Sequence, residues 1–522
     1  MPGTPVAIGP WPGGLNCSRE SSTITDQEVA EALNLEFLPD GSAVSRPVIL
    51  VEWEPTGSEP AGTVPVGELQ QLGFYVRTSG TTQLVVADDA ATWLYDVDTH
   101  AWTKIWTHPA TGFVQYLENA VLISTSVAGG YWDGATWHDT PTMPLGAQIV
   151  FYQERFWAFG AKGTPNANRV WFSNLTVISP PSTIFDWTVA TDFFEVGPGD
   201  GQWITGLVSD SSALIIFRNL STWVFTFPAD PGDGTLRRIS GTTGADSMYC
   251  VVPYENFYFV FNQGHLYQFI SYQFYAVDLN KVVFRRQATP GDVLHPFRLS
   301  VLGERIVVWY LGETLVYNVA SSTWSRWRSE TTWLCHFAQR PPNSAQGDYR
   351  TGYGITGVDL AGMPNTIYRI QEETPQLPPG ETFTCALITK AHAFEQPSRF
   401  KRQTMWTVEV ASSDGITGYL YPRVLSGDTT TWDVMETVAW DTLDEGNWDN
   451  PLVTSAVVID PVSYPTQAPV RELIKLHGPR RFLRVEYEVR KEIDGTSRTS
   501  PFRIYTMTAY LMMRGKTREK VS

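Results

Sequence analysis

The side chains best suited to chemistry in this sequence are clustered carboxylates. Residues 441–450 (DTLDEGNWDN) hold four carboxylates within ten positions, and carboxylates are the ligands that Ca²⁺ prefers. The segment does not follow the D-x-[DN]-x-[DN]-G spacing of a calcium loop. A solvated acidic loop is therefore the favoured interpretation, and no bound metal is expected.

Two segments combine an aspartate with a following tryptophan. WDGATW (132–137) approaches the aspartate box of sialidase-type propellers but is one residue short, and SGDTTTW (426–432) has Thr430 in place of the box glycine. Such boxes are turns rather than catalytic residues, so a polar turn followed by a Trp anchor is favoured. A glycan hydrolase remains a remote alternative, because sequence spacing cannot select two carboxylates that lie ~5–9 Å apart in a fold.

The familiar catalytic signatures are absent from the sequence. It contains no G-x-S-x-G elbow, no H-E-x-x-H, no P-loop and no strand-linked G-x-G-x-x-G, and its eight His are scattered. The basic segment 471–491 fits a solvated sheet face, or a partner for the acidic loop, better than it fits a phosphate site. We therefore predict a protein that is not an enzyme and needs no cofactor.

Cysteine use and charge narrow the class of protein further. The four Cys are far apart and include no C-x-x-C pair, which predicts reduced, buried thiols rather than disulfides or a zinc site. They are Cys17, Cys250, Cys335 and Cys385. Residues 1–389 carry 20 basic and 37 acidic side chains, against 18 and 17 in residues 390–522. The acidic front part argues against a clamp for nucleic acid, although acidic walls would suit DNA as a passing cargo.

The chain shows no signal for a membrane or for export. No apolar stretch reaches the ~18 residues of a transmembrane helix, so no membrane insertion is expected. The N-terminal segment lacks the basic and apolar regions of a secretory signal, which predicts synthesis in a cytoplasm.

The elements that must carry these side chains are short strands. Aromatic residues make up 13% of the 522 residues and charged residues only 18%, with 42 Gly and 35 Pro spread along the chain. Between residues 68 and 372, apolar runs such as QLVVADD, ALIIFR and RIVVWYL alternate with turn residues, as is typical of strands. These features predict an all-β protein.

Two hairpins in this region are related to each other. LYDVDTHAWTKIW (94–106) and VYNVASSTWSRWR (316–328) both place a Trp seven positions after a Tyr, and GYWDGATWHD (130–139) is a weaker relative. At ~40–50 residues per blade, the ~305 residues of this region make a β-propeller of six or seven blades. Two or three sandwich domains in a row are the alternative. The predicted blade-packing anchors are Tyr95, Trp102, Trp137, Trp171, Trp187, Trp223, Tyr317 and Trp324.

The two ends of the chain are predicted to differ from this middle region. Residues 1–67 are assigned to an N-terminal strap, with one small helix over QEVAEALNL (27–35) and a hairpin over LNLEFLPDGSAVSRP (33–47). The propeller is assigned to residues 68–372, and residues 373–382 form a Pro-rich linker. Residues 383–522 are predicted to form one C-terminal β-sandwich with a basic tail.

The opening segment also resembles a known family. VAIGPWPGGLN…DQEVAEALNLEFLPDGSAVSRPVI (6–49) is similar to the N-terminus of minor tail proteins of tailed phages that infect actinobacteria. The shared features are a Gly-Gly-Leu-Asn turn, an acidic helix start and a D-G-S-x-V-S-R-P hairpin. Residues 169–225, with a G-[DP]-G-D element and an I-T-G-L strand, resemble the propeller of the same proteins and, more loosely, tail nozzle proteins of short-tailed phages. AFEQPSRFKRQTMWTVEV (393–410) is like the beginning of their C-terminal sandwich.

The resemblance implies a structural component of the virion, made in the host cytoplasm and without enzymatic activity. It would assemble with copies of itself and with other tail proteins, as a ring or cluster at the tail tip or distal hub. The assembly contacts are then expected in the strap, at Trp11, Gly13, Gly14, Leu15, Asn16, Arg46 and Pro47. A tail protein that binds a receptor or glycan on the host surface is the alternative.

Overall fold

The fold is known from a computed structural model. The structure describes residues 4–17, 25–56, 58–60, 62–67, 69–76, 82–107, 112–116, 121–125, 127–145, 148–160, 165–174, 187–228, 230–277, 298–310, 313–327, 334–339, 351–356, 366–371, 382–389, 392, 401–411, 416–425, 456–459, 471–476, 484–494 and 503–513. Across these residues the chain forms strands almost throughout, with two short 3-10 helices, which confirms the all-β prediction.

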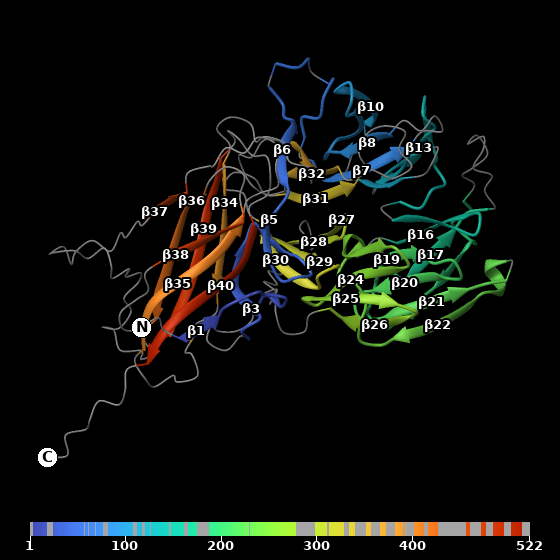
Figure 1. Cartoon of the computed structure of the whole chain (residues 1–522). Coiled ribbons are helices and arrows are strands. Elements are labelled where there is room, and N and C mark those ends of the chain that lie inside the picture. The colour runs from blue at the N-terminus through green and yellow to red at the C-terminus, as the bar shows by residue number, and fades with distance from the viewer. Residues whose placement is uncertain are drawn as a thin grey trace.

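The middle of the chain forms consecutive four-stranded antiparallel meanders, here called blades 1 to 7 (Figure 1). Blades 1 and 2 consist of β7 (Gln71–Val76), β8 (Thr82–Ala87), β9 (Ala91–Asp96) and β10 (Ala101–Thr107), then β11 (Gly112–Tyr116), β12 (Val121–Thr125), β13 (Gly129–Trp132) and β14 (Trp137–Asp139). Blades 3 and 4 consist of β15 (Ile149–Tyr152), β16 (Arg155–Phe159), β17 (Arg169–Phe172) and β18 (Phe193–Glu195), then β19 (Ile204–Ser209), β20 (Leu214–Arg218), β21 (Thr222–Thr226) and β22 (Thr235–Ser240).

The remaining blades follow the same plan. Blade 5 consists of β23 (Val251–Tyr254), β24 (Phe257–Asn262), β25 (His265–Ile270) and β26 (Gln273–Ala276), and blade 6 of β27 (Arg298–Leu302), β28 (Arg305–Tyr310), β29 (Glu313–Asn318) and β30 (Thr323–Trp327). Blade 7 combines β31 (Leu334–Gln339), β32 (Gly352–Thr356) and β33 (Ile367–Gln371) with β6 (Val48–Trp53). The described residues thus form seven blades, at the upper end of the predicted number.

An apolar core lies between each blade and the next, and together these cores close a ring. Each core pairs large side chains from two neighbouring blades, because twisted four-stranded sheets leave a space that aromatic and branched residues fill. In ring order they include Val85 with Ile123, Leu122 with Phe156, Trp157 with Ile216, Phe217 with Phe269, Phe259 with Tyr317, Val316 with Ile370, and Ile355 with Tyr95. The first strand of each blade faces the centre, and β31 contacts both β27 and β7. This closed order of blades is a β-propeller.

The ring is joined by a strand from the N-terminal region. β6 forms the outer strand of blade 7 by pairing with β33, with Leu50 opposite Arg369. Residues before position 68 therefore complete the propeller, and the expected boundary between strap and propeller does not separate the strands of this sheet. The last blade therefore takes its outer strand from the N-terminal region. The ring is closed by the hydrogen bonds and packing between β6 and β33 and not by a covalent link.

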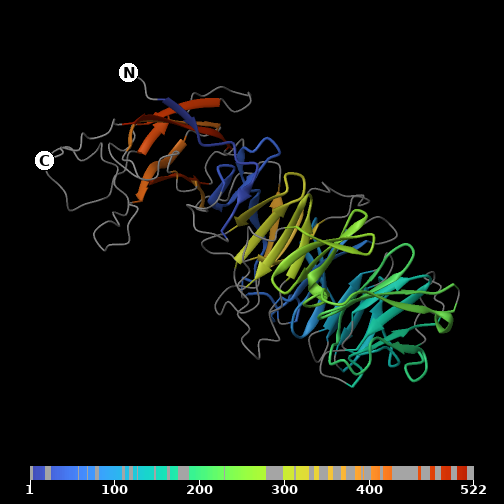
Figure 2. The ribbon, with the colours of Figure 1, turned by 90° about the horizontal axis from the view of Figure 1, so that it is seen from below.

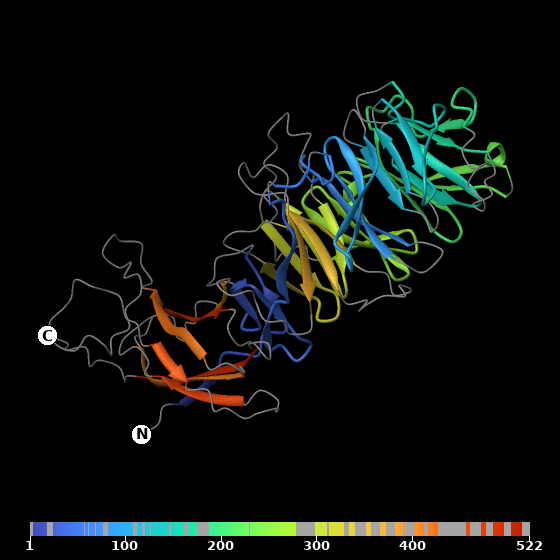
Figure 3. The ribbon, with the colours of Figure 1, turned by 90° about the horizontal axis from the view of Figure 1, so that it is seen from above.

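The other N-terminal strands combine with strands from the C-terminal region. The N-terminal set is β1 (Thr4–Ala7), β2 (Gly14–Leu15), β3 (Glu28–Leu33), β4 (Leu35–Phe37) and β5 (Ala43–Ser45). The C-terminal set is β34 (Thr382–Thr389), β35 (Lys401–Ala411), β36 (Ile416–Leu425), β37 (Ala456–Ile459), β38 (Arg471–Leu476), β39 (Arg484–Asp494) and β40 (Arg503–Met513). Figures 2 and 3 show the C-terminal strands at one end of an elongated molecule and the propeller at the other, with most of the N-terminal strands between them.

These twelve strands, here called the terminal strands, belong to two sheets. One sheet has the order β38-β35-β40-β5-β4, with β1 also paired to β40. In the other, β3 continues into β34, β39, β36 and β37, and the opposite edge of β3 meets β30 of blade 6. The strap is therefore not a separate segment, because its strands are divided between the propeller and the sheets of the C-terminal region.

The small helix predicted over residues 27–35 is wrong, because residues 28–33 form strand β3. The segment has helical propensity and an acidic start, but both of its edges find strand partners, in β34 and β30. Tertiary pairing outweighs local propensity when it satisfies the backbone of a whole segment. The hairpin predicted beside it is confirmed, because Leu35 pairs with Ser45 and Phe37 with Ala43.

Several predictions fall on residues that the structure does not describe. They concern the acidic loop 441–450, the segment 426–432, the basic tail and all of the linker except Thr382, which begins β34. In the described part of the chain, no helix is long and apolar enough to span a membrane.

Candidate functional site at the junction of the propeller and the terminal strands

The residues that the sequence singled out in the N-terminal region meet at one place, where blade 6, β3 and β34 adjoin. Leu33 is the central position of this junction, since it pairs with Arg326 of blade 6 on one side and with Ala386 of β34 on the other. The chain approaches β3 through a tight turn at Gly13 and Gly14. Gly14 has φ +65°, and an added Cβ would lie 2.7 Å from the Cβ of Thr323, so only glycine fits against blade 6 there.

The interior of the junction is apolar. Trp11 is fully buried and Trp324 is 1% exposed, and both belong to one cluster with Leu15 and with Met507 of β40. The same cluster continues into blades 5 and 6 through Tyr317. Burial of large aromatic side chains makes the dominant contribution to such an interface. The propeller and the terminal strands therefore share one continuous core.

Asn34 organises the polar part of the junction. Its backbone is left-handed (φ 54°), and its N–H donates to the carbonyl of Arg326 at 2.7 Å. The buried Arg46 donates through Nε to Asn34 Oδ1 and through Nη1 to the carbonyl of Pro47, both at 2.9 Å. The thiol of Cys385 lies 3.3 Å from the Asn34 carbonyl oxygen. Arg46, in the R-P part of the D-G-S-x-V-S-R-P pattern, thus stabilises the turn at Asn34 between β3 and β4.

Ion pairs tie the same segment to both sides of the junction. Glu36 Oε1 lies 2.7 Å from Arg305 Nε, and both side chains are largely buried. On the other side, Arg503 of β40 donates to Asp40 and to Ser42. Burial works to raise the pKa of Asp40, but hydrogen bonds from Ser42 and the charge of Arg503 outweigh it and hold the pKa below its usual value. The Asp40 carboxylate therefore stays charged and bonded at neutral pH.

Five of the seven predicted assembly contacts lie inside this chain rather than on its surface. The buried residues among them are Trp11, Gly14, Leu15, Asn16 and Arg46. The other two, Gly13 and Pro47, are half-buried. A buried side chain is not available to a neighbouring subunit, so the junction inside one chain accounts for these residues. The expectation of uniformly buried thiols is also corrected, because Cys250 and Cys385 are buried but Cys17 is exposed.

The predicted blade-packing anchors lie in or against the apolar cores of the propeller. Tyr95 pairs with Trp102 across the β9–β10 hairpin, and Tyr317 pairs with Trp324 across the β29–β30 hairpin, which confirms the repeat read from their spacing. Trp171 and Trp187 lie in the core between blades 2 and 3, and Trp223 packs against the core between blades 3 and 4. Trp137 stacks on Trp106, with ring centroids 4.4 Å apart.

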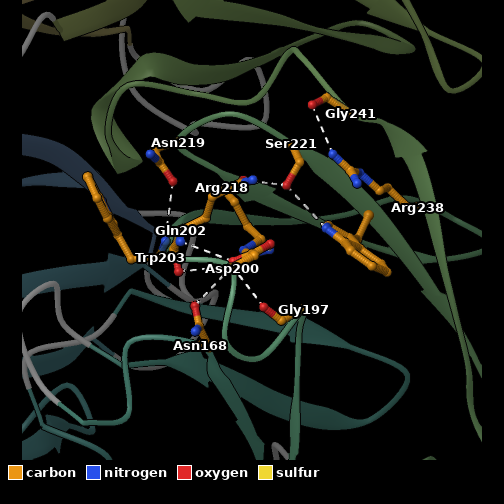
Figure 4. Close-up of polar contacts among 11 residues, drawn as sticks. Asn168, Gly197, Asp200, Gln202, Trp203, Arg218, Asn219, Ser221, Arg238 and Gly241 are labelled. Atoms are coloured by element: carbon orange, nitrogen blue, oxygen red, sulfur yellow. Dashed lines mark hydrogen bonds and ion pairs between the residues drawn. The ribbon is translucent and has the colours of Figure 1, made fainter.

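A buried arginine that the sequence did not single out holds blades 3 and 4 together. Arg218, at the end of β20, is 0% exposed, and its Nη1 donates to Asp200 Oδ2 at 2.7 Å (Figure 4). Its Nη2 donates to Asp200, to Asn168 Oδ1 and to the carbonyls of Gly197 and Gln202. The Arg218 hydrogen bond holds the pKa of Asp200 below its usual value. The G-[DP]-G-D element, which is residues 197–200, is thus the loop that encloses this guanidinium. This element was the one sequence feature that pointed to the Arg218 site.

A second ionisable cluster lies where β6 joins the ring. The Glu52 side chain is almost fully buried, and its carboxylate accepts a hydrogen bond from Tyr95 Oη at 3.3 Å. It also lies 3.4 Å from His100 Nδ1 and 3.6 Å from Arg369 Nε. Burial raises the pKa of Glu52, and the nearby Arg369 and His100 only partly oppose that effect. This cluster links β6 to blade 1 as well as to β33.

The geometry of the junction suits mechanical linkage. Hydrogen-bonded strands, a shared core and paired charges all join segments that are hundreds of residues apart in the chain. In the part of the chain that the structure describes, no group of three or more His, Cys, Asp or Glu is placed to hold a metal ion.

Comparison with known proteins gives similarity of fold alone. No family model matches the chain, and no curated protein matches it. A chain of the mitotic checkpoint complex is similar with a TM-score of 0.40 and 9% identity, over 65% of this chain and 94% of that one. The β-propeller domain of Myceliophteria thermophila Cps50 (Swd1) is similar with a TM-score of 0.40 and 12% identity, over 59% and 98%. The propeller assignment rests on the sheet order and the cores between blades.

Proposed function

We propose that this chain is a non-catalytic structural component of a phage tail, at the tail tip or distal hub. The resemblance of residues 6–49 and 169–225 to minor tail proteins supports the proposal. The observation that carries it is the sheet that runs from blade 6 through β3 into β34 and β39. Continuous strand pairing and a shared core make the propeller and the terminal strands one stiff body, which is what a part that transmits force requires.

The proposal assigns a separate role to the terminal strands. The two sheets that they form are proposed to be the layers of a β-sandwich, with β3 and β34 in one layer and β5 and β40 in the other. The sandwich would contact neighbouring tail proteins or the next copy, while the propeller serves as a platform. Copies arranged in a ring would surround the DNA, and the acidic residues of positions 1–389 would keep passing DNA from adhering.

The proposal is tested on phage particles whose genome encodes this chain. Immunogold labelling with an antibody against the purified chain should mark the end of the tail, and cryo-electron microscopy should show several copies around the tail axis. Pre-absorbing the antibody with purified chain is the control and should abolish the label. Particles that contain no copy of the chain would overturn the proposal.

A second candidate function is binding to glycan on the host surface, which an exposed aromatic side chain favours. Tyr275 on β26 is 51% exposed, and its hydroxyl donates to Gln273 at 2.7 Å. Half-buried His265 and Tyr267 lie on the adjacent strand β25. An aromatic ring with polar neighbours suits stacking against a sugar.

This second function predicts that the purified chain co-sediments with host cell-wall fragments. Tyr275→Ala should reduce that binding, whereas Val127→Ala, at a comparably exposed apolar position in blade 2, should not. Equal binding by both variants, or no binding by the wild-type chain, would remove the candidate.

A further inference from the structure

Side chains from blades 5 and 6 meet a side chain of blade 1, which neighbours neither of them, at one end of the propeller axis. Gln71 begins β7, the inner strand of blade 1, and Arg298 begins β27, the inner strand of blade 6. Tyr249 lies in the 3-10 helix η3 (Met248–Cys250), which leads directly into β23, the inner strand of blade 5. Because the inner strands of a propeller run in the same direction around its axis, all three residues lie at the end where these strands begin.

The contacts among these residues are direct. Gln71 Nε2 donates to Tyr249 Oη at 2.7 Å. The guanidinium of Arg298 lies 4.6 Å from the centre of the Tyr249 ring, and its Nη1 donates to the carbonyl oxygen of Gln70. Gln71 is 2% exposed and Arg298 is 6% exposed, so both groups are removed from water. Buried hydrogen bonds and a desolvated cation over an aromatic face are stronger than the same contacts at a surface.

The order of the blades shows where these contacts run. Blade 5 is separated from blade 1 by blades 6 and 7 on one side and by blades 2, 3 and 4 on the other. A side chain of blade 1 can therefore reach a side chain of blade 5 only across the central opening. We infer that Gln71, Tyr249 and Arg298 form an axial clasp that closes the propeller axis at this end.

The axial clasp also spans the place where the ring is joined. β6 completes blade 7 without a covalent link to β33, so the ring can part at that strand or at the neighbouring contact between blades 7 and 1. Arg298 connects blade 6 to Gln70, directly before β7 of blade 1, past blade 7, and Tyr249 connects blade 5 to Gln71, the first residue of β7. The clasp is thus a second closure of the ring, independent of β6.

Two consequences follow for the behaviour of the molecule. The axis of the propeller is closed at this end, so a polymer such as DNA cannot thread it. The surfaces left for contact with other molecules are its rim, its outer faces and the terminal strands. Both consequences hold for the isolated chain, whether or not it is a tail component.

Hydrogen exchange of the purified full-length chain, followed by mass spectrometry, tests the clasp. Tyr249→Phe removes the hydroxyl that Gln71 binds but keeps the ring, and Arg298→Met removes the guanidinium. Each variant should speed amide exchange in β6 and β7 by about two- to tenfold, the effect of losing one buried hydrogen bond on local opening. Exchange in β16 and β20 of the distant blades 3 and 4 should stay unchanged.

Tyr275→Phe is the matched control, because it also removes a hydroxyl bonded to a glutamine in blade 5, but at the surface. It should leave β6 and β7 at the wild-type rate. The inference is overturned if Tyr249→Phe leaves those strands unchanged, or if it speeds exchange equally in every blade. Should Arg298→Met fail to fold, Tyr249→Phe alone decides, since the ring that packs under Arg298 is retained.

Discussion

Arg218 illustrates how one side chain can organise a loop and two blades. It is completely buried, yet its donors reach Asp200, Asn168 and two backbone carbonyls, so its charge is compensated within the protein. A buried guanidinium is tolerated only when it is paired and hydrogen-bonded in this way. The loop that carries Asp200 joins blade 3 to blade 4, and Arg218 therefore determines how those blades meet.

Replacing Asp200 with Asn should lower the free energy of unfolding by about 1.5–3 kcal/mol, the range for hydrogen bonds to a charged group. Because the Arg218 hydrogen bond lowers the pKa of Asp200, this contribution is present above the usual aspartate pKa and is lost as the pH falls through the folded-state pKa. Urea unfolding at pH 7 and pH 3 checks both points. Asp230→Asn, an exposed position in the same blade, should have little effect.

Glu52 is expected to change the stability with pH in the opposite direction from Asp200. Its pKa is raised by burial, so it contributes stability that is fully present below the unfolded-state pKa and is lost as the pH rises through the folded-state pKa. Glu52→Gln keeps an acceptor for Tyr95 and removes the buried charge. The variant should be at least as stable as wild type at pH 8 and should show a flatter pH dependence between pH 4.5 and 8 in urea unfolding. A steeper dependence would contradict the assignment.

At the scale of elements, the same hairpin serves different purposes in blades 1 and 6. In blade 1, Trp102 is half-buried and packs on Trp53 of β6, with ring centroids 4.8 Å apart. In blade 6, the equivalent Trp324 is covered by the N-terminal strands. Identical spacing in the sequence therefore leads to unequal burial, because blade 6 alone among the described blades pairs its outer strand with β3.

This difference predicts unequal effects of the same substitution. Trp324→Ala should destabilise the chain by about 3–5 kcal/mol, as expected for a fully buried aromatic residue, and Trp102→Ala by about half as much. The free energies of unfolding measured in urea give the comparison directly. Equal losses would show that the N-terminal strands add little to the packing around Trp324.

The turn at Gly14 provides a test of the approach between β2 and blade 6. Gly14→Ala combines a left-handed backbone with a Cβ 2.7 Å from Thr323, so we expect a loss of about 2–4 kcal/mol in unfolding free energy. Gly199→Ala has the same type of backbone, with φ +83° and nothing within 4 Å. It should cost only about 1–2 kcal/mol, the backbone term alone. If both cost the same, the close approach to Thr323 is unimportant.

At the scale of the whole molecule, the propeller and the terminal strands should unfold together. They share the sheet through β3 and the core that contains Trp11 and Trp324, so neither part can open without exposing the other. Thermal unfolding followed by tryptophan fluorescence and by hydrogen exchange in β40 should show one transition at one temperature. Loss of β40 protection well below the fluorescence midpoint would contradict this coupling.

The sequence predicted those features that depend on local patterns. Alternating apolar runs predicted strands, the Tyr-to-Trp spacing predicted cross-strand pairs in two hairpins, and Pro39-Asp40-Gly41 predicted the β4–β5 hairpin. The segment at residues 28–33 was predicted wrongly, since its helical propensity is outweighed by partners more than 290 residues away in the chain. Local rules cannot include such partners.

Composition and spacing by themselves thus determined an all-β chain built from repeated, aromatic-rich hairpins. Only the tertiary structure decided which strands complete which sheet: that β6 closes the ring, that β3 joins blade 6 to β34, and that Gln71 meets Tyr249 across the axis. The physical reason is that side-chain alternation within a strand reports which face is buried, whereas the choice of neighbouring strand depends on contacts between segments far apart in the sequence.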